Sequence, residues 1–247
     1  MNAALTDLEQ QQASLAQVQL DDFRASSLFE FVGKRTIAGS VLDVGCGGGG
    51  MVAWLLRRGY DARGVDSSPS TIRAAKAFLS GLGLDPSAVS STAIETLVQQ
   101  GQQADNVISM DCLEHIEDDS AAFANLVRLV KPNGRLIVTV PALAALYGDR
   151  DRKIGHYRRY SPARLRSLTA SQPIRVDDLR YWNMLGVAPT FASHRILNRA
   201  VNESFRYGNP SPAKRALRQA LGWWFRRVEN QIRPPLGLTL VMTARRL

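Results

Sequence analysis

The fold of this chain is decided by the stretch Val41-Leu42-Asp43-Val44-Gly45-Cys46-Gly47-Gly48-Gly49-Gly50. Its first four residues have strand character and run directly into glycines that only Cys46 interrupts. Glycine lets the backbone approach a ligand closely, and a helix that follows presents free amides to that ligand. The stretch therefore predicts a strand, a ligand-binding loop and a helix in immediate succession.

Around this loop, short apolar runs alternate with helical patterns. Strands are expected at Ser40–Val44, Ala62–Val65, Ala88–Ser91, Asn106–Met110 and Arg135–Val140, and helices at Met51–Arg58, Pro69–Ser80 and Ser120–Val130. Pro132-Asn133-Gly134 is expected to form a turn at the start of the fifth strand. This alternation predicts an α/β protein with a Rossmann-like, doubly wound, mostly parallel sheet that helices cover on both faces.

After Pro141 the pattern is less regular. We expect a charged loop over 147–160, a helix from Ser161, a strand over 175–182, a basic helical insertion and a last, antiparallel strand at Leu236–Thr243. The chain is predicted to have an N-terminal helical segment (1–35), a cofactor-binding core (36–145) and a region (146–247) that completes the same domain. That last region would hold a substrate loop, the basic helices and the final strands.

Length and composition exclude several classes of protein. With 247 residues, of which 45% are hydrophobic and 21% charged, the chain can bury one sizeable core and is neither fibrous nor disordered. Two cysteines, Cys46 and Cys112, cannot form a disulfide framework or a paired zinc motif. The N-terminus has no signal-peptide pattern, and no apolar run approaches the roughly 18 residues that span a bilayer. We therefore expect a cytoplasmic protein.

The charge is distributed unevenly along the chain. Residues 1–149 contain 11 Lys and Arg against 17 Asp and Glu, whereas residues 150–247 contain 20 against 5. The net charge of +9 thus arises entirely from the C-terminal region. Such a region is expected to face an anionic partner, which the charge alone does not identify as a small molecule, a nucleic acid or a lipid.

Two acidic residues narrow the choice of cofactor. Gly45, Gly47 and Gly50, with Asp66 at the end of the second strand, also fit the dinucleotide-binding pattern, so the glycines alone leave a dehydrogenase open. Asp43, however, stands at the mouth of the loop, where it would repel a pyrophosphate and attract an ammonium or sulfonium group. This electrostatic difference favours S-adenosylmethionine and hence methyl transfer.

Four segments in order resemble motifs of the class I S-adenosylmethionine-dependent methyltransferases, in the branch of small-molecule enzymes of the ubiquinone-methyltransferase type. They are Val41–Gly49, Gly64–Ser68, Asp105–Ile116 and Leu129–Leu136, and the resemblance covers residues 36–145. It implies a cofactor site formed by Asp43, Gly45, Cys46, Gly47, Gly49, Asp66, Ser67, Ala93, Ile94, Met110, Asp111 and Leu113. One departure is that Thr92 and Ala93 stand where an acid commonly holds the adenine, so backbone groups near Ala93 and Ile94 are expected to replace it.

The acceptor side is expected in the stretch that follows the fifth strand. Similar GHxRRYS segments occur in parts of this family, and Tyr147, Arg158, Arg159 and Tyr160 are the predicted substrate contacts. His156 is the predicted general base and His115, after the fourth strand, a second catalytic candidate; no metal is expected. The alternative is that 147–160 forms a solvated loop whose Asp and Arg pair, and that His115 belongs to an acidic helix start.

The favoured function is O-methylation of a small or lipid-linked acceptor, anionic or aromatic, such as a sugar, a phenol or a quinone precursor. N-methylation stays open, but Asp111-Cys112-Leu113-Glu114 stands where base-amine methyltransferases often carry an Asn/Asp-Pro-Pro-aromatic motif. An RNA-modifying enzyme and a non-catalytic scaffold are the alternatives. The basic helical stretch 213–233 predicts either contact with a membrane surface or packing on its own domain. The oligomeric state is not predicted.

Overall fold

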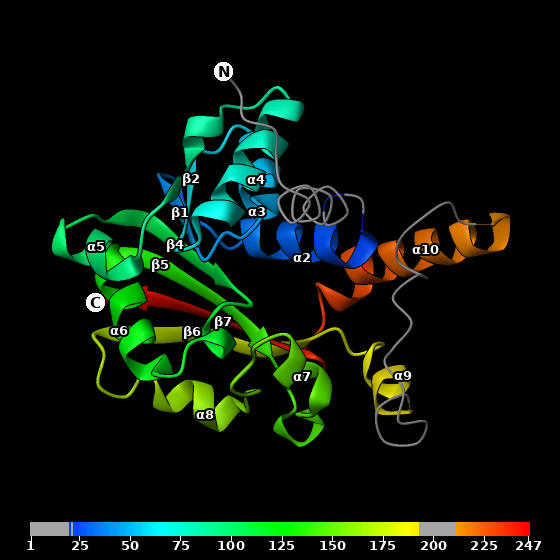
Figure 1. Cartoon of the computed structure of the whole chain (residues 1–247). Coiled ribbons are helices and arrows are strands. Elements are labelled where there is room, and N and C mark those ends of the chain that lie inside the picture. The colour runs from blue at the N-terminus through cyan, green and yellow to red at the C-terminus, as the bar shows by residue number, and fades with distance from the viewer. Residues whose placement is uncertain (1–19, 21, 193–210) are drawn as a thin grey trace.

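The computed structural model describes residue 20, residues 22–192 and residues 211–247. Its centre is a seven-stranded sheet with the order β3-β2-β1-β4-β5-β7-β6 (Figure 1). The strands are β1 (Val41–Val44), β2 (Ala62–Asp66), β3 (Val89–Ser91), β4 (Ala104–Met110), β5 (Val130–Pro141), β6 (Ile174–Trp182) and β7 (Thr239–Arg246). Strands β1 to β5 pair in parallel, while β7 lies antiparallel between β5 and β6. This confirms the predicted Rossmann-like sheet with an antiparallel last strand.

Helices surround the sheet. The α-helices are α2 (Phe23–Gly33), α3 (Gly50–Leu56), α4 (Pro69–Gly81), α5 (Ile94–Gln99), α6 (Asp119–Leu129), α7 (Asp149–Lys153), α8 (Pro162–Ser167), α9 (Val187–Phe191) and α10 (Pro212–Trp224). Short 3₁₀ turns lie at η1 (Pro86–Ala88), η2 (Leu113–His115) and η3 (Ala144–Leu146), and a π-helical turn, η6 (Phe225–Glu229), follows α10. Local caps explain two starts: Ser68 accepts from the Thr71 amide and Asp118 from the Ala121 amide.

The central strands are buried on both faces, which explains their continuous apolar sequences. In β5, Leu136 and Val138 pack into a core cluster with Phe123 of α6. Ile137, which points to the other face, packs into a second cluster with Phe31 of α2 and residues of α3. The sheet is therefore held between two helical layers, and its parallel strands end together at one edge.

Some element boundaries differ from the prediction. β5 begins at Val130, so the expected turn at 132–134 lies inside the strand, where Asn133 has a φ of 62°. β7 begins at Thr239 rather than Leu236, because Gly237 passes the Trp182 backbone at a point where a Cβ would lie 2.3 Å from its carbonyl oxygen. The six-residue α5 was not predicted, since its pattern is too short to read.

The region beyond Pro141 shows the largest correction. The stretch 147–160 is not wholly a loop, because it contains α7, whose start is fixed by the Gly148 amide donating to Asp151 at 3.1 Å. The predicted basic helix is present as α10 and η6. Of the expected N-terminal helices the structure gives α2, and residues 1–19 and 21 lie outside the described part, as do residues 193–210 of the basic insertion.

In the parts of the chain that the structure describes, every helix is too short or too polar to cross a bilayer.

Candidate active site

The glycine loop turns tightly over the end of β2. The amides of Gly45 and Cys46 both donate to the Val65 carbonyl, at 2.8 and 3.0 Å. A Cβ at Gly45 would lie 2.4 Å from the Cys112 sulfur, and the φ there is 76°, so only glycine fits. At Gly47, by contrast, a Cβ would meet no atom within 4 Å. The loop thus closes against the protein on one side and leaves open space on the other, directly before α3.

Asp66 is held at this loop by two backbone amides. Its Oδ2 accepts from the Gly47 amide at 3.1 Å and its Oδ1 from the Ser68 amide at 2.9 Å. A carboxylate oxygen has more than one acceptor direction, so Asp66 retains capacity for two hydroxyl donors such as those of a ribose. The neighbouring predicted contact, Ser67, is exposed at the same place.

Asp43 lies in β1 and is only 2% exposed. Burial, with the negative charge of Asp66 adding to it, raises the pKa of the Asp43 carboxyl to about 7. A carboxyl in this state gains most from a ligand that brings a positive charge to it. The residues present therefore fit a cationic cofactor such as S-adenosylmethionine better than one that carries phosphates.

The remaining predicted cofactor residues fall into two groups. Ala93 precedes α5, and Ile94, Met110 and Asp111 are half-buried or exposed at the ends of β3 and β4. The side chains of Cys46 and Leu113 belong to core clusters, at 8% and 1% exposure. Burial also raises the pKa of the Cys46 thiol far above its usual range. At these two positions the backbone, rather than the side chain, is available to a ligand.

A cavity of about 590 Å³ lies beside this edge of the sheet. Its polar wall contains Asp111, Glu114, Arg150, Asp151, His156, Arg159 and Asn183. Its apolar wall contains Phe23, Ile154, Leu185, Pro189, Leu221, Phe225 and Leu238. The two walls come from different elements, since η2, α7 and the stretch after it supply most of the polar groups and α2, α9, α10 and η6 most of the apolar ones. A ligand with one polar and one apolar part matches this division.

His156 is oriented within the polar wall by an acid. Its Nδ1 lies 3.1 Å from Asp151 Oδ1, and its Nε2 lies 3.9 Å from Glu114 Oε1. Burial, together with the nearby His115, lowers the pKa of His156 below 6.5. Although burial works against its charge, the hydrogen bond and the charge of Arg159 keep the pKa of Asp151 below its ordinary value. The pair is thus a neutral imidazole held by a carboxylate, an arrangement suited to a general base.

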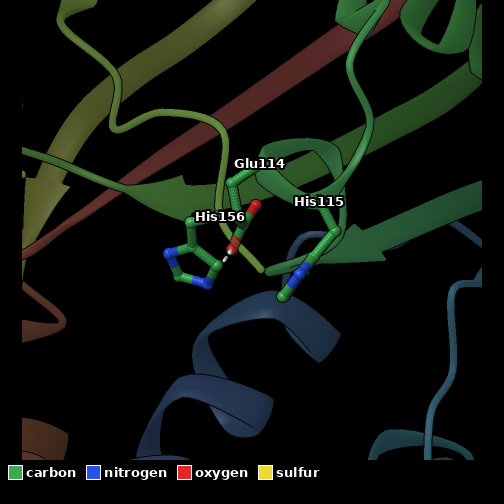
Figure 2. A group of neighbouring side chains, drawn as sticks. All are labelled: Glu114, His115 and His156. Atoms are coloured by element: carbon green, nitrogen blue, oxygen red, sulfur yellow. Dashed lines mark ion pairs between the residues drawn. The ribbon is translucent and has the colours of Figure 1, made fainter. Parts of the chain in front are cut away.

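Glu114 is fully buried and neither of its carboxylate oxygens has a hydrogen-bond partner. Burial, with the charge of Asp111 adding to it, raises the pKa of Glu114 well above its ordinary value. Figure 2 shows the Glu114 carboxyl directed toward His156, with His115 on its other side. Ligand atoms of Glu114, His115 and His156 all lie within 4.8 Å of one another. This trio could hold a proton, or one divalent cation, between its members.

The predicted substrate contacts are not all at the cavity. Arg159 lines it and binds Asp151 through Nε at 2.8 and 3.0 Å. The Tyr147 hydroxyl donates to the His156 carbonyl at 2.9 Å and so supports the stretch that holds the imidazole. Arg158 pairs with Asp119 at 3.1 Å, and Tyr160 is fully buried with its hydroxyl on the same carboxylate at 3.0 Å. Arg158 and Tyr160 therefore lie outside the lining of this cavity, and their role as substrate contacts stays a prediction.

Sequence reasoning missed three parts of the site. The sequence leaves Glu114 open between the ligand end of the sheet and the start of an acidic helix. It assigns no role to Asp151, five residues before His156, because that role depends on α7 in a stretch expected to be a loop. The apolar wall had no sequence signal, because Phe23 and Phe225 meet only in the folded chain, at 6.1 Å between ring centres.

Comparisons with known proteins agree with this geometry. Residues 42–138 match the family described as methyltransferase domain. A ubiquinone biosynthesis O-methyltransferase from Methylobacterium nodulans is 36% identical over 95 residues, which cover 38% of this chain and 38% of that protein. Another, from Brucella anthropi, is 34% identical over 109 residues, 44% of each chain. The chain thus matches about two fifths of the length of these curated relatives.

Solved structures show the same fold. A chain from the complex between the Haloferax volcanii Trm112 methyltransferase activator and a methyltransferase has a TM-score of 0.61 and 16% identity, covering 98% of this chain and 99% of that one. A SAM-dependent methyltransferase from Archaeoglobus fulgidus has a TM-score of 0.56 and 14% identity, covering 90% of this chain and 92% of that one. At these identities the likeness is one of fold.

Proposed function

We propose that this protein transfers the methyl group of S-adenosylmethionine to an oxygen atom of a small acceptor, since residues 42–138 match the methyltransferase domain family and the relatives named above are O-methyltransferases. The observation that carries the proposal is the buried carboxyl of Asp43 beside an open glycine loop. Such a carboxyl is stabilised by a cationic donor and would repel the pyrophosphate of a dinucleotide.

In this proposal the chain's own residues hold the cofactor at three points. Asp43 faces the ammonium end, the amides around Gly47 and Gly49 approach the cofactor backbone, and Asp66 accepts from the ribose hydroxyls. When bound, S-adenosylmethionine supplies an electrophilic methyl group and its own leaving group. The protein's task is then to align the acceptor with that methyl group and to remove the acceptor's proton.

His156 is the proposed general base. Asp151 holds its Nδ1, so that Nε2 is left for the hydroxyl proton of the acceptor. A pKa below 6.5 keeps the imidazole neutral, and therefore basic, at neutral pH. The Glu114 carboxyl, which burial holds toward its neutral form by raising its pKa, lies 3.9 Å from Nε2 and presents an oxygen to the imidazolium that forms. The rest of the rate enhancement then comes from positioning the acceptor oxygen in line with the methyl group.

The two walls of the cavity suggest the chemical class of the acceptor. Arg150 and Arg159 on the polar wall suit an anionic or polyhydroxylated head, and the apolar wall suits a ring or a hydrocarbon chain. We therefore propose a phenol, a quinone precursor or a lipid-linked sugar as the acceptor. The O-methyltransferases among the relatives support oxygen as the methylated atom.

Calorimetry tests the cofactor part of this proposal. Wild-type protein is titrated with S-adenosylhomocysteine and, separately, with NAD. We expect heat with the first ligand and none with the second; the reverse result would point to a dehydrogenase. Transfer of labelled methyl groups to a panel of phenols, lipid-linked sugars and RNA then tests the acceptor. Transfer to RNA alone would contradict the small-acceptor proposal.

A further inference from the structure

Helix α10 carries an exposed apolar stripe in addition to its exposed polar residues Lys214, Arg215 and Gln219, whereas an ordinary surface helix buries its apolar stripe. One face of this helix, here called the outer face of α10, is formed by residues at positions i, i+3, i+4, i+7 and i+10, namely Ala213, Ala216, Leu217, Ala220 and Trp223. All five are exposed, Leu217 at 49% and Trp223 at 58%. A stripe of this kind normally lies against the protein's own core.

The opposite side of α10 already has its partners. Gly222 is buried, and a Cβ there would come within 3.4 Å of Phe23 in α2. Leu221 lines the cavity. Trp224, four residues after Ala220, lies at the C-terminal end of the apolar face itself, where it is half-buried and donates its indole N–H to Glu229, whose other oxygen accepts from the Met184 amide. The C-terminal end of the helix is thus fixed to the body, and Figure 1 shows α10 projecting away from the sheet.

Basic side chains accompany the outer face. Residues 212–228 contain Lys214, Arg215, Arg218, Arg226 and Arg227 and no acidic residue. The combination of a shallow apolar stripe, an exposed tryptophan and flanking positive charge is typical of helices that lie in the headgroup region of a bilayer. The tryptophan ring is suited to that boundary because it is largely apolar and carries one polar N–H.

Other macromolecules fit this face less well. A second copy of the chain would bring the same positive charges into contact. Five side chains, three of them alanine, are also far fewer than the roughly 20–30 residues a side of a stable protein interface. RNA would use the basic groups but not the leucine and alanine stripe. An anionic lipid surface uses both features at once.

The cavity opens next to this helix. Leu185 and Ile154 line the cavity and are 41% and 51% exposed, and Phe191, directly after the lining residue Thr190, is 51% exposed. Leu217 lies one turn before the lining residue Leu221 on α10. Apolar surface therefore continues from the cavity wall outward toward the outer face of α10.

We propose that the outer face of α10 docks on an anionic lipid membrane and thereby brings the cavity mouth to an acceptor carried in that membrane. Leu217 and Trp223 enter the headgroup boundary, and the flanking Lys and Arg contact lipid phosphates. This inference rests on the proposed function for the identity of the acceptor as a lipid-linked molecule, but the docking itself is measured without any acceptor.

The first experiment measures binding of the full-length protein to vesicles. Flotation with phosphatidylcholine vesicles is compared with flotation on vesicles that also contain phosphatidylglycerol. We expect binding only to the anionic vesicles, weakening as salt rises. Tryptophan emission should shift to shorter wavelength on binding, and this shift should be largely lost in Trp223→Phe, since Trp54 and Trp182 are buried and the half-buried Trp224 donates its indole N–H to Glu229. Flotation that is absent or equal on both kinds of vesicle would overturn the proposal.

Variants then locate the contact. Leu217→Ser with Trp223→Ser should abolish flotation, while Ile37→Ser, which changes another exposed apolar side chain (37%), should leave it unchanged. Lys214→Gln with Arg215→Gln should weaken vesicle binding roughly 30-fold, from about 1 kcal/mol for each basic side chain. The matched control is Arg63→Gln with Lys76→Gln, two exposed residues of β2 and α4. Equal losses in the controls would overturn the assignment.

Two further measurements separate the competing outcomes. If light scattering reveals a dimer that Leu217→Ser dissociates, the partner of this face is a second copy of the chain. If the wild type binds RNA and Lys214→Gln with Arg215→Gln abolishes that binding, the partner is RNA. Either result would overturn the membrane proposal. Calorimetry with S-adenosylhomocysteine is run on the same samples. Cofactor binding without vesicle binding overturns only the membrane proposal, whereas vesicle binding without cofactor binding overturns only the methyltransferase proposal.

Discussion

The proposed cofactor edge and the proposed acceptor cavity lie side by side but are assembled differently. At the cofactor edge, Asp43, Gly45 and Gly47 come from one stretch of five residues, and Asp66 joins them through a single hydrogen bond to the Gly47 amide. The cavity takes its walls from residues between Phe23 and Thr239, in elements with no common motif. The cofactor site is therefore a local property of the sequence, whereas the acceptor site is a property of the whole fold.

This contrast predicts that changes on the two sides have separable effects. The largest is expected at the base. His156→Ala should lower kcat by about 10²–10⁴-fold, because general base catalysis is lost, while the affinity for S-adenosylhomocysteine stays unchanged. In the wild type, kcat should rise with pH through a pKa below 6.5, since burial lowers the pKa of His156. Steady-state kinetics between pH 5 and 9 check both.

The control for this prediction is His115→Ala. It removes the second imidazole, which touches His156 edge-on at 4.6 Å but has no link to Asp151 among the contacts seen here. If His156→Ala keeps normal turnover at every pH, His156 is not the general base. If only His115→Ala loses turnover, His115 is the general base instead.

The second prediction concerns the cofactor edge. Asp43→Asn should weaken S-adenosylhomocysteine binding by at least about 100-fold, because the buried ammonium loses its counter-charge at a cost of about 3–5 kcal/mol. In the wild type, affinity should increase as pH rises through about 7, where Asp43 ionises. Calorimetry over this range should also detect release of a proton on binding. Asp85→Asn, at an exposed acid, is the control and should bind normally.

Although Asp43→Asn should weaken cofactor binding, it should increase the stability of the folded protein. The pKa of Asp43 is about 7 in the folded protein against an ordinary 3.8, so the folded state binds more protons between these values and loses stability as pH rises through them. At pH 8 the ionised form costs about 4 kcal/mol by this shift. Asp43→Asn should therefore raise the melting temperature at pH 8 and change it little at pH 4. A variant that melts lower at pH 8 would contradict the assigned burial.

These two sides also differ in how far the sequence revealed them. The glycine loop, its two acids and the order of five parallel strands follow from local patterns, because backbone conformation and strand ends depend on neighbouring residues. The pairing of His156 with Asp151 and the isolation of Glu114 could not be predicted, since α7 and the position of η2 against it are set by tertiary contacts. Tyr160 shows the same limit, because an aromatic side chain in a charged stretch is equally suited to a ligand or to the core.

The third prediction concerns Glu114→Gln, which should have a smaller effect on kcat and tests the role of Glu114 beside His156. Because burial raises the pKa of Glu114 and holds its carboxyl toward the neutral form, the neutral amide is a close substitute, and kcat should fall by less than about tenfold. Cofactor affinity should not change. Treatment with EDTA is the accompanying measurement: wild-type turnover that is lost with the chelator and restored by Zn²⁺ would mean that Glu114, His115 and His156 act on a bound cation instead.

The smallest effect is expected for Tyr160→Phe, which tests whether Tyr160 belongs to the acceptor site. Tyr160→Phe removes the hydroxyl that donates to Asp119 at 3.0 Å in a buried position. Asp119 retains its pairs with Arg158 and Arg164, so the cost should be about 1–2 kcal/mol of unfolding free energy, measured by urea denaturation. Because the hydroxyl lies away from the cavity, kcat and KM should equal those of the wild type. A raised KM with unchanged stability would return Tyr160 to the acceptor site and move the boundary between the two regions.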